Sequence, residues 1–152
     1  MKCIFEKDIH IFRKQEKTNI VLPFTLPFDG EELKITFCYS PKILENEAEA
    51  QNQIKYCLIR DGYEEEICKW EEYLPLKNLI TLSLDDPEGY RGCAHRHSPY
   101  QEHNISEKSA SPGFLKGRII KGEWKAVLNV HALVTQSCDV HIKVEAGGER
   151  YE

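Results

Sequence analysis

Alternating apolar and polar side chains limit the fold of this chain more than any other feature. At least every second residue is apolar in 33–40, 79–84, 124–130 and 138–145, so each stretch has one apolar face. A period of two residues is typical of a half-buried β-strand. Such faces need a second apolar layer, which two packed antiparallel sheets provide. The sequence therefore predicts a mainly β fold, an antiparallel β-sandwich with jelly-roll-like winding, as a single domain of residues 1–152.

One segment departs from the two-residue period. Within 47–60 the apolar residues recur with helical spacing, and charged or amide residues fill the other positions. Asn46 can cap the start of a helix, with Glu49 at the capping-box position, and Gly62 suits its end. We expect one inserted α-helix around residues 47–60, followed by an exposed, irregular connection over 63–73. The apolar residues at helical spacing are Ala50, Ile54, Cys57 and Leu58.

The charge and hydropathy of the chain argue against several classes of function. Its formal net charge is −5 at pH 7, whereas nucleic-acid binding needs clustered Lys and Arg. No apolar run approaches the roughly 18 residues of a membrane-spanning helix. Glu6 and Asp8 stand where a secretory signal would be apolar. We therefore expect a cytoplasmic protein that binds neither nucleic acid nor membrane.

The six cysteines are irregularly spaced, and none forms a C-x-x-C pair. Without an export signal they are expected to be reduced thiols. Because a free cysteine behaves as a small apolar side chain, we also expect most of them to be buried.

Three short motifs occur in order in the second half of the chain. They are D-P-x-G-Y-R-G at 86–92, A-x-P-G-F at 110–114 and G-x-W at 122–124. Together they resemble the β-sandwich region that precedes the metal-dependent hydrolase domain in CehA/McbA-like proteins of the PHP superfamily. The resemblance is best over 76–144 and weaker over 21–39. It implies the sandwich fold and an accessory role. The hydrolase domain that follows in those proteins has no counterpart in this sequence, so we expect no catalytic residue here.

His95 and His97 form an H-x-H sequence like the one that begins a PHP metal site. Here Ser98-Pro99-Tyr100 follows, whereas the family usually has Ser-Asp-Gly. A zinc site would need three or four converging ligands, and the histidines are spread over several segments. We interpret His95 and His97 as loop or strand-end residues, and we expect no metal and no cofactor.

Residues 85–89 are best explained as a turn, in which Asp bonds nearby backbone, Pro fixes φ and Gly takes a positive φ. Arg91 follows closely and has two interpretations. It could bond loop carbonyls and stack on Trp124, or it could grip a carboxylate or phosphate of a ligand. The candidate ligand-binding residues are Tyr90, Arg91, His95 and His97.

Three functions remain open at this point. The first, which we favour, is a non-catalytic interaction module that docks on a PHP-type hydrolase domain, on another subunit or on a second copy of itself. The second is a module that binds a small ligand such as a carbohydrate, favoured if several aromatic residues are exposed on one face. The third is a fragment of a metal-dependent phosphoesterase, which the missing motifs argue against. The aromatic residues concerned are Tyr63, Trp70, Tyr73, Tyr90 and Tyr100.

Overall fold

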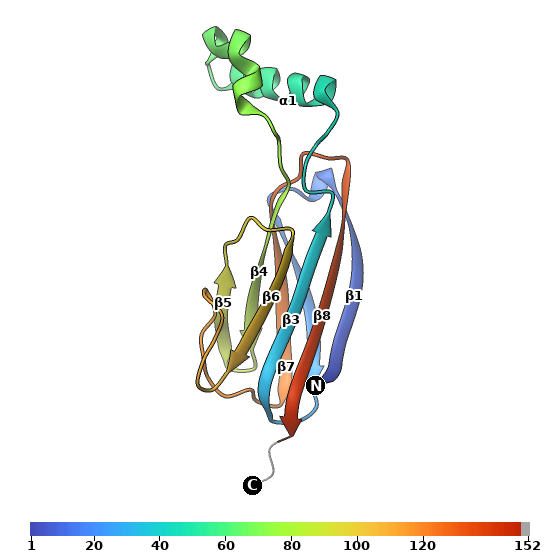
Figure 1. The fold of residues 1–152 in the computed structure, drawn as a ribbon, viewed down its shortest axis with the longest axis vertical. Coiled ribbons are helices and arrows are strands. Elements are labelled where there is room, and N and C mark those ends of the chain that lie inside the picture. The colour runs from blue at the N-terminus through green and yellow to red at the C-terminus, as the bar shows by residue number, and fades with distance from the viewer. Residues whose placement is uncertain (150–152) are drawn as a thin grey trace.

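The computed structural model describes residues 1–149, and residues 150–152 of the expected domain lie outside this range. Eight strands form the body of the molecule, and a helical segment stands at one end of it (Figure 1). No helix among residues 1–149 has the length and apolar character to cross a bilayer. The elements are β1 (Lys2–Phe12), η1 (Arg13–Gln15), β2 (Thr18–Leu26), β3 (Gly30–Ser40), α1 (Glu47–Arg60), η2 (Glu64–Tyr73), β4 (Leu79–Asp86), β5 (Gly89–Ala94), β6 (Tyr100–Ser106), β7 (Gly122–Ala132) and β8 (Ser137–Glu149).

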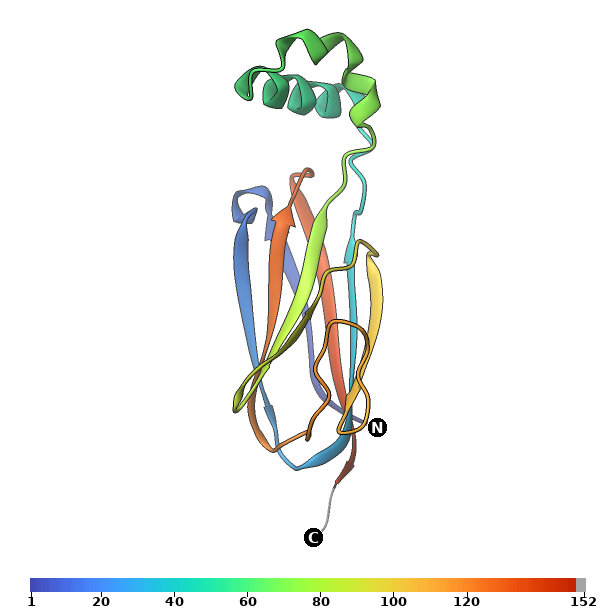
Figure 2. The same ribbon diagram turned by 90° about the vertical axis from the view of Figure 1, so that its left-hand side faces the viewer.

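The strands make two four-stranded sheets, with the orders β1-β8-β3-β6 and β2-β7-β4-β5. Every pair of neighbouring strands is antiparallel. Figure 2 shows the two sheets as facing layers. The predicted antiparallel β-sandwich is therefore confirmed. The pairing of β1 with β8, β2 with β7, β3 with β6 and β4 with β5 is compatible with the expected jelly-roll-like winding.

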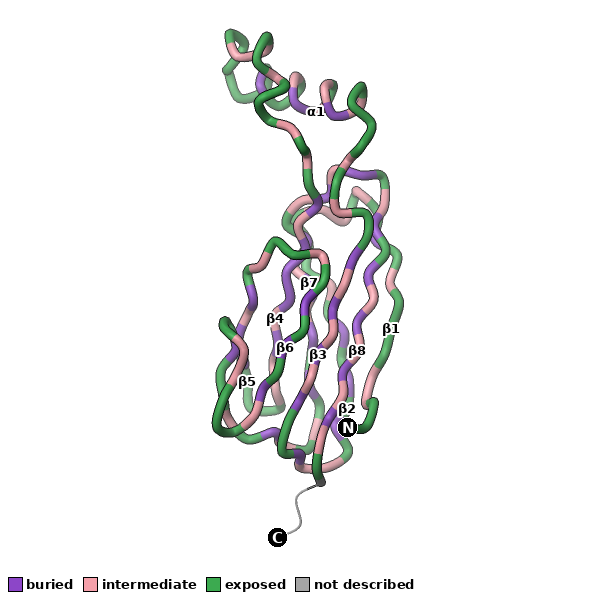
Figure 3. Tube along the Cα trace, viewed as in Figure 1, coloured by how far each residue is buried: buried purple, intermediate pink, exposed green. Residues whose placement is uncertain are grey.

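The core lies between the sheets and is built from the predicted alternating faces. Buried and more exposed residues alternate along β3, β7 and β8 (Figure 3). Trp124 has no exposed surface, and its indole Nε1 donates to the carbonyl of Ile120 at 2.9 Å. Burying one large aliphatic side chain contributes about 1.5–3 kcal/mol, so these faces hold the sheets together. Fully buried examples are Ile35, Leu82, Leu128 and Ile142.

The predicted helix is present with the predicted bounds. The Asn46 side chain accepts a hydrogen bond from the backbone N–H of Glu49 at 3.0 Å, which satisfies one of the free donors of the first turn. Gly62 follows the helix with φ of +83°. The buried stripe of α1 consists of Ala50, Ile54 and Leu58, four residues apart. Cys57, which we expected on this stripe, lies beside it and is exposed.

The expectation of an exposed, irregular connection over 63–73 is half right. None of η2 is buried, but Glu64–Tyr73 form a 3-10 helix, kinked at Lys69, which packs against α1. The sequence does not predict η2, because Glu64, Glu65 and Glu66 leave its first turn without apolar residues at helical spacing. We call residues 41–77, which contain α1, η2 and their connections to β3 and β4, the helical insertion. It stands beyond one end of the sandwich instead of covering a sheet (Figures 1 and 2).

The expectation for the cysteines is half right. All six are free thiols, but Cys138 alone is buried. Burial and the neighbouring Asp139 raise the pKa of the Cys138 thiol to about 11. Cys3, Cys57 and Cys68 are exposed because each lies at an edge strand or in the helical insertion, where few elements cover them.

Candidate functional site

The turn between β4 and β5 has the predicted construction. The Asp86 carboxylate accepts hydrogen bonds from the backbone N–H groups of Glu88 at 2.6 Å and Gly89 at 2.9 Å. Gly89 takes φ of +137°. The second carboxylate oxygen of Asp86 accepts from Arg91 Nη1 at 2.9 Å, and both side chains are more than nine-tenths buried. The aspartate thus closes the turn and holds the arginine.

The remaining N–H groups of Arg91 point to the long loop before β7. Nε donates to the carbonyl of Leu115 at 3.1 Å, Nη1 to that of Arg118 at 2.9 Å and Nη2 to that of Gly117 at 3.2 Å. The guanidinium carbon lies 5.3 Å from the centre of the Trp124 ring, a cation–π contact. These contacts correspond to the first of the two interpretations of Arg91, in which it bonds loop carbonyls and stacks on Trp124. Its guanidinium is occupied by protein groups, which leaves little of it for a ligand.

The glycines of the same motifs allow close backbone contact. Gly92 has φ of +117° and Gly113 has φ of +98°. A Cβ atom on Gly92 would clash with the carbonyl oxygen of Gly113 and with Cα of Phe114. The three motifs of the family resemblance therefore meet in one network, which joins the β4–β5 turn, the loop before β7 and Trp124. Its residues are used to hold backbone in place.

The four candidate ligand-binding residues are not gathered at one point. Arg91 is buried, whereas Tyr90, the preceding residue, is 62% exposed. His95 and His97 lie exposed in the loop after β5, as expected. The His95 ring centre is 6.2 Å from that of His131. Across residues 1–149 no group of three or more His, Cys, Asp and Glu side chains is arranged to hold a metal ion.

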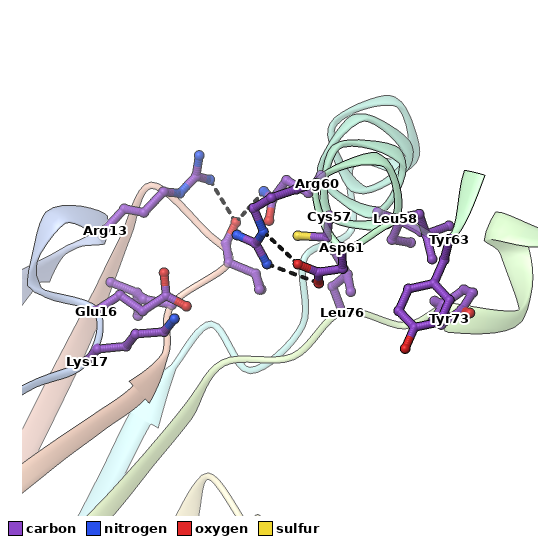
Figure 4. A pocket seen from close by; sticks show the side chains of 14 residues that line it. Arg13, Glu16, Lys17, Cys57, Leu58, Arg60, Asp61, Tyr63, Tyr73 and Leu76 are labelled. Atoms are coloured by element: carbon purple, nitrogen blue, oxygen red, sulfur yellow. Dashed lines mark hydrogen bonds and ion pairs between the residues drawn. The ribbon is translucent and has the colours of Figure 1, made fainter. Parts of the chain in front are cut away.

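A hollow that the sequence did not indicate lies between the helical insertion and the end of the sandwich. This insertion groove has a volume of about 550 Å³ (Figure 4). Apolar residues of α1 meet apolar residues of the sandwich end in it, and charged residues and two tyrosines complete the wall. The lining residues are Arg13, Glu16, Lys17, Gln53, Ile54, Cys57, Leu58, Arg60, Asp61, Tyr63, Tyr73, Leu76, Leu133 and Val134.

Polar contacts tie α1 to the sandwich at one side of the groove. Arg13 Nη2 lies 2.6 Å from Glu49 Oε1 and donates to the carbonyl of Val134 at 2.7 Å. Gln53 Nε2 donates to the same carbonyl at 2.9 Å. These contacts link η1, α1 and the β7–β8 loop, and η2 contributes Tyr73, so the walls of the groove come from four segments of the chain.

The charges in the groove are mixed. Arg60 bonds the Asp61 carboxylate at 3.1 Å, and this hydrogen bond lowers the pKa of Asp61. Lys17 lies across the groove (Figure 4) and adds a weaker attraction to the same carboxylate. Lys17 also has φ of +64°, a conformation that costs a non-glycine residue about 1–3 kcal/mol. Backbone strain of this kind is often found at binding sites.

The aromatic residues proposed for carbohydrate binding are exposed but do not share one face. Tyr63 and Tyr73 line the insertion groove and are 56% and 46% exposed. Tyr90 lies at the β4–β5 turn, Tyr100 lies on β6, and Trp70 is half-buried. The condition of one shared aromatic face is therefore not met, although the insertion groove brings Tyr63 and Tyr73 together.

Comparison with known proteins adds no identity to this geometry. No protein-family model matches the chain, and a search of curated proteins finds no match.

Proposed function

We propose that this chain is a non-catalytic interaction module that recognises its partner through the helical insertion and the insertion groove. One observation carries the proposal. Of the eleven large apolar side chains that are exposed among residues 1–149, five lie within the helical insertion. That segment is about a quarter of the described chain, so exposed apolar surface is concentrated there, as at many docking sites. The five residues are Ile43, Tyr56, Ile59, Tyr63 and Tyr73.

The partner that best fits is a PHP-type hydrolase domain in the cytoplasm, either in a separate subunit or in the same polypeptide. The resemblance over 76–144 supports this choice, because such sandwiches accompany those hydrolase domains. The network around Arg91 supports the non-catalytic part of the proposal, since it uses the motif residues for backbone contacts. The helical insertion stands beyond one end of the sandwich (Figure 1), where its exposed side chains can contact another domain.

The test uses this chain and a purified PHP-type hydrolase domain encoded in the same genome. Isothermal titration calorimetry should detect a complex, and light scattering after size-exclusion chromatography should give its stoichiometry. Replacing Tyr63 and Tyr73 together by Ser should weaken binding at least about tenfold, because exposed aromatic anchors often dominate docking. Tyr90→Ser is the matched control, since Tyr90 is equally exposed but lies on the β4–β5 turn.

Two results would count against the proposal. One is the absence of a complex at protein concentrations where transient docking is measurable. The other is a complex that Tyr90→Ser weakens as much as the double variant does, because recognition would then not depend on the insertion groove.

A small ligand is the second candidate for the same groove. Its volume of about 550 Å³ is within the roughly 300–1,000 Å³ that is usual for small-molecule pockets. Screening a fragment library by nuclear magnetic resonance distinguishes the two functions. Hits that shift the amides of Leu58, Leu76 and Leu133 would favour a small ligand, and their absence beside a measurable protein complex would favour docking.

A further inference from the structure

The outer face of the β1-β8-β3-β6 sheet carries a repeated sequence that the proposed function does not use. Asp8-Ile9-His10 on β1 and Asp139-Val140-His141 on β8 both have the form Asp-x-His. The antiparallel register sets Asp8 opposite His141 and His10 opposite Asp139. Because alternate residues share a face, the two aspartates and two histidines form a square on the solvent side.

Within this square each imidazole is bonded to the carboxylate opposite. His10 Nδ1 lies 2.6 Å from Asp139 Oδ1, and His141 Nδ1 lies 2.6 Å from Asp8 Oδ1. His141 Nε2 lies 3.0 Å from Glu6 Oε2. A carboxylate has two oxygens with about four acceptor positions, so each aspartate keeps acceptors for a ligand. Asp8 and Asp139 are also well exposed, with side chains that are 86% and 78% accessible.

The square borders a hollow of about 690 Å³ on the same face, which we call the sheet trough. The trough runs across the sheet from β8 over β3 to β6, since Cys38 on β3 lies opposite both His141 on β8 and Tyr100 on β6. Tyr100 is 56% exposed, and its hydroxyl donates to Glu102 Oε1 at 2.8 Å, which raises the pKa of the phenol. The trough therefore has an exposed aromatic ring at one side and paired carboxylates at the other. Its lining residues are Asp8, Ile9, His10, Cys38, Tyr39, Ser40, Pro99, Tyr100, Asp139, Val140 and His141.

We propose that the sheet trough binds a neutral carbohydrate. A pyranose ring presents C–H groups on one face and hydroxyl groups around its edge. The C–H face would lie on the Tyr100 ring, whose amphipathic surface suits such contacts. The hydroxyls would donate to the acceptor positions that Asp8 and Asp139 keep, and one would exchange a hydrogen bond with Nε2 of His10, since both ring nitrogens of His141 already face carboxylates.

The charges of the trough favour a neutral ligand over an anion. Within the described part of the chain no lysine or arginine lines the trough, and carboxylates repel phosphate and sulfate groups. The histidine nitrogens that face carboxylates are already engaged, and among residues 1–149 no group of three or more His, Cys, Asp and Glu side chains is arranged to hold a metal ion. A polyhydroxylated molecule needs only what the trough offers, namely exposed acceptors beside a flat ring.

The experiment is a titration of the ¹⁵N-labelled chain with four probes: cellobiose, maltose, lactose and methyl α-mannoside, each to high millimolar concentration. At least one should shift amide resonances of β1, β3, β6 and β8 around the trough. Tyr100→Ala should weaken that binding roughly tenfold or more, as loss of an aromatic platform does. Asp139→Asn keeps the shape of its side chain and should also weaken binding. Tyr90→Ala removes an equally exposed ring elsewhere and should leave binding unchanged.

Three outcomes would overturn the proposal. The first is that none of the four sugars shifts the trough resonances of the folded wild-type chain. The second is that the shifts map to Tyr63 and Tyr73 in the insertion groove. The third is that the sugars bind only after Ca²⁺ or Zn²⁺ is added, because a metal ion would then hold the ligand. Docking of a protein partner at the insertion groove is measured separately, so failure of either proposal leaves the other to its own test.

Discussion

Acidification should destabilise the protein through His103. This residue has no exposed surface and packs with its ring centre 4.8 Å from that of Phe114. Its Nε2 lies 2.9 Å from Gln101 Oε1, an atom that can only accept, so the neutral ring carries its proton on Nε2. Nδ1 is buried and has no hydrogen-bond partner among residues 1–149. A second proton would place an unpartnered N–H and a positive charge inside the sandwich.

The loss of folding stability on protonating His103 follows from the pKa of its side chain. Burial, with a smaller contribution from the charge of Arg96, lowers the pKa of His103 from 6.5 to about 4. The unfolded chain therefore binds this proton first as the pH falls. Stability is lost from about pH 6.5 downward and reaches its full loss below about pH 4. At about 1.4 kcal/mol per pKa unit, the difference amounts to about 3 kcal/mol.

The assay is urea unfolding at a series of pH values between 7 and 4, for the wild type and for His103→Leu. The variant leaves Gln101 short of a partner and should be less stable at pH 7, but that cost does not depend on pH. The wild type should therefore lose about 3 kcal/mol more than the variant over this range. Equal losses in the two proteins, or a His103 resonance that titrates near its ordinary pKa of 6.5, would refute the reasoning.

Three further predictions concern the network and the outer sheet face. Arg91→Ala should cost about 3–5 kcal/mol of unfolding free energy in urea, because it strands the buried Asp86 carboxylate, whereas Arg60→Ala should barely move the midpoint. Gly92→Ala should prevent folding, seen as loss of the β circular dichroism signal, because its Cβ meets backbone. Gly62→Ala, with a positive φ but open space around it, should cost only about 1–2 kcal/mol. The hydrogen bond with Asp8 raises the pKa of His141, so the stability that this bond contributes is complete below about pH 6.5 and is lost as the pH rises above it. The unfolding free energy of the wild type should therefore exceed that of His141→Asn by less at higher pH, and a difference that grows with rising pH would contradict this.

Much of the sandwich could be predicted because its strands are half-buried. The faces of 33–40, 124–130 and 138–145 are apolar at every second residue, and that period alone assigns the strands and their inward sides. The cap at Asn46 likewise assigns the start of α1. Patterns within one segment were sufficient to predict a strand or helix wherever they also showed which of its faces is buried.

The insertion groove and the sheet trough depend instead on which distant segments meet in the fold, and the period of apolar residues within one segment does not reveal this. The insertion groove joins η1, α1, η2 and the β7–β8 loop, and of its lining residues the sequence marks only Tyr63 and Tyr73 as candidates for ligand contact. The two Asp-x-His sequences are about 130 residues apart, so nothing local indicates that they pair. A search for repeated tripeptides on strands predicted to share a sheet could have found them.

Docking through the helical insertion is tested most directly by hydrogen–deuterium exchange of this chain, free and with the PHP-type hydrolase domain. The account predicts slower exchange on complex formation in residues 54–76 and 133–134, which surround the insertion groove, and unchanged exchange at the β4–β5 turn. Protection confined to the turn or to the sheet faces, with the helical insertion exchanging as in the free protein, would contradict it.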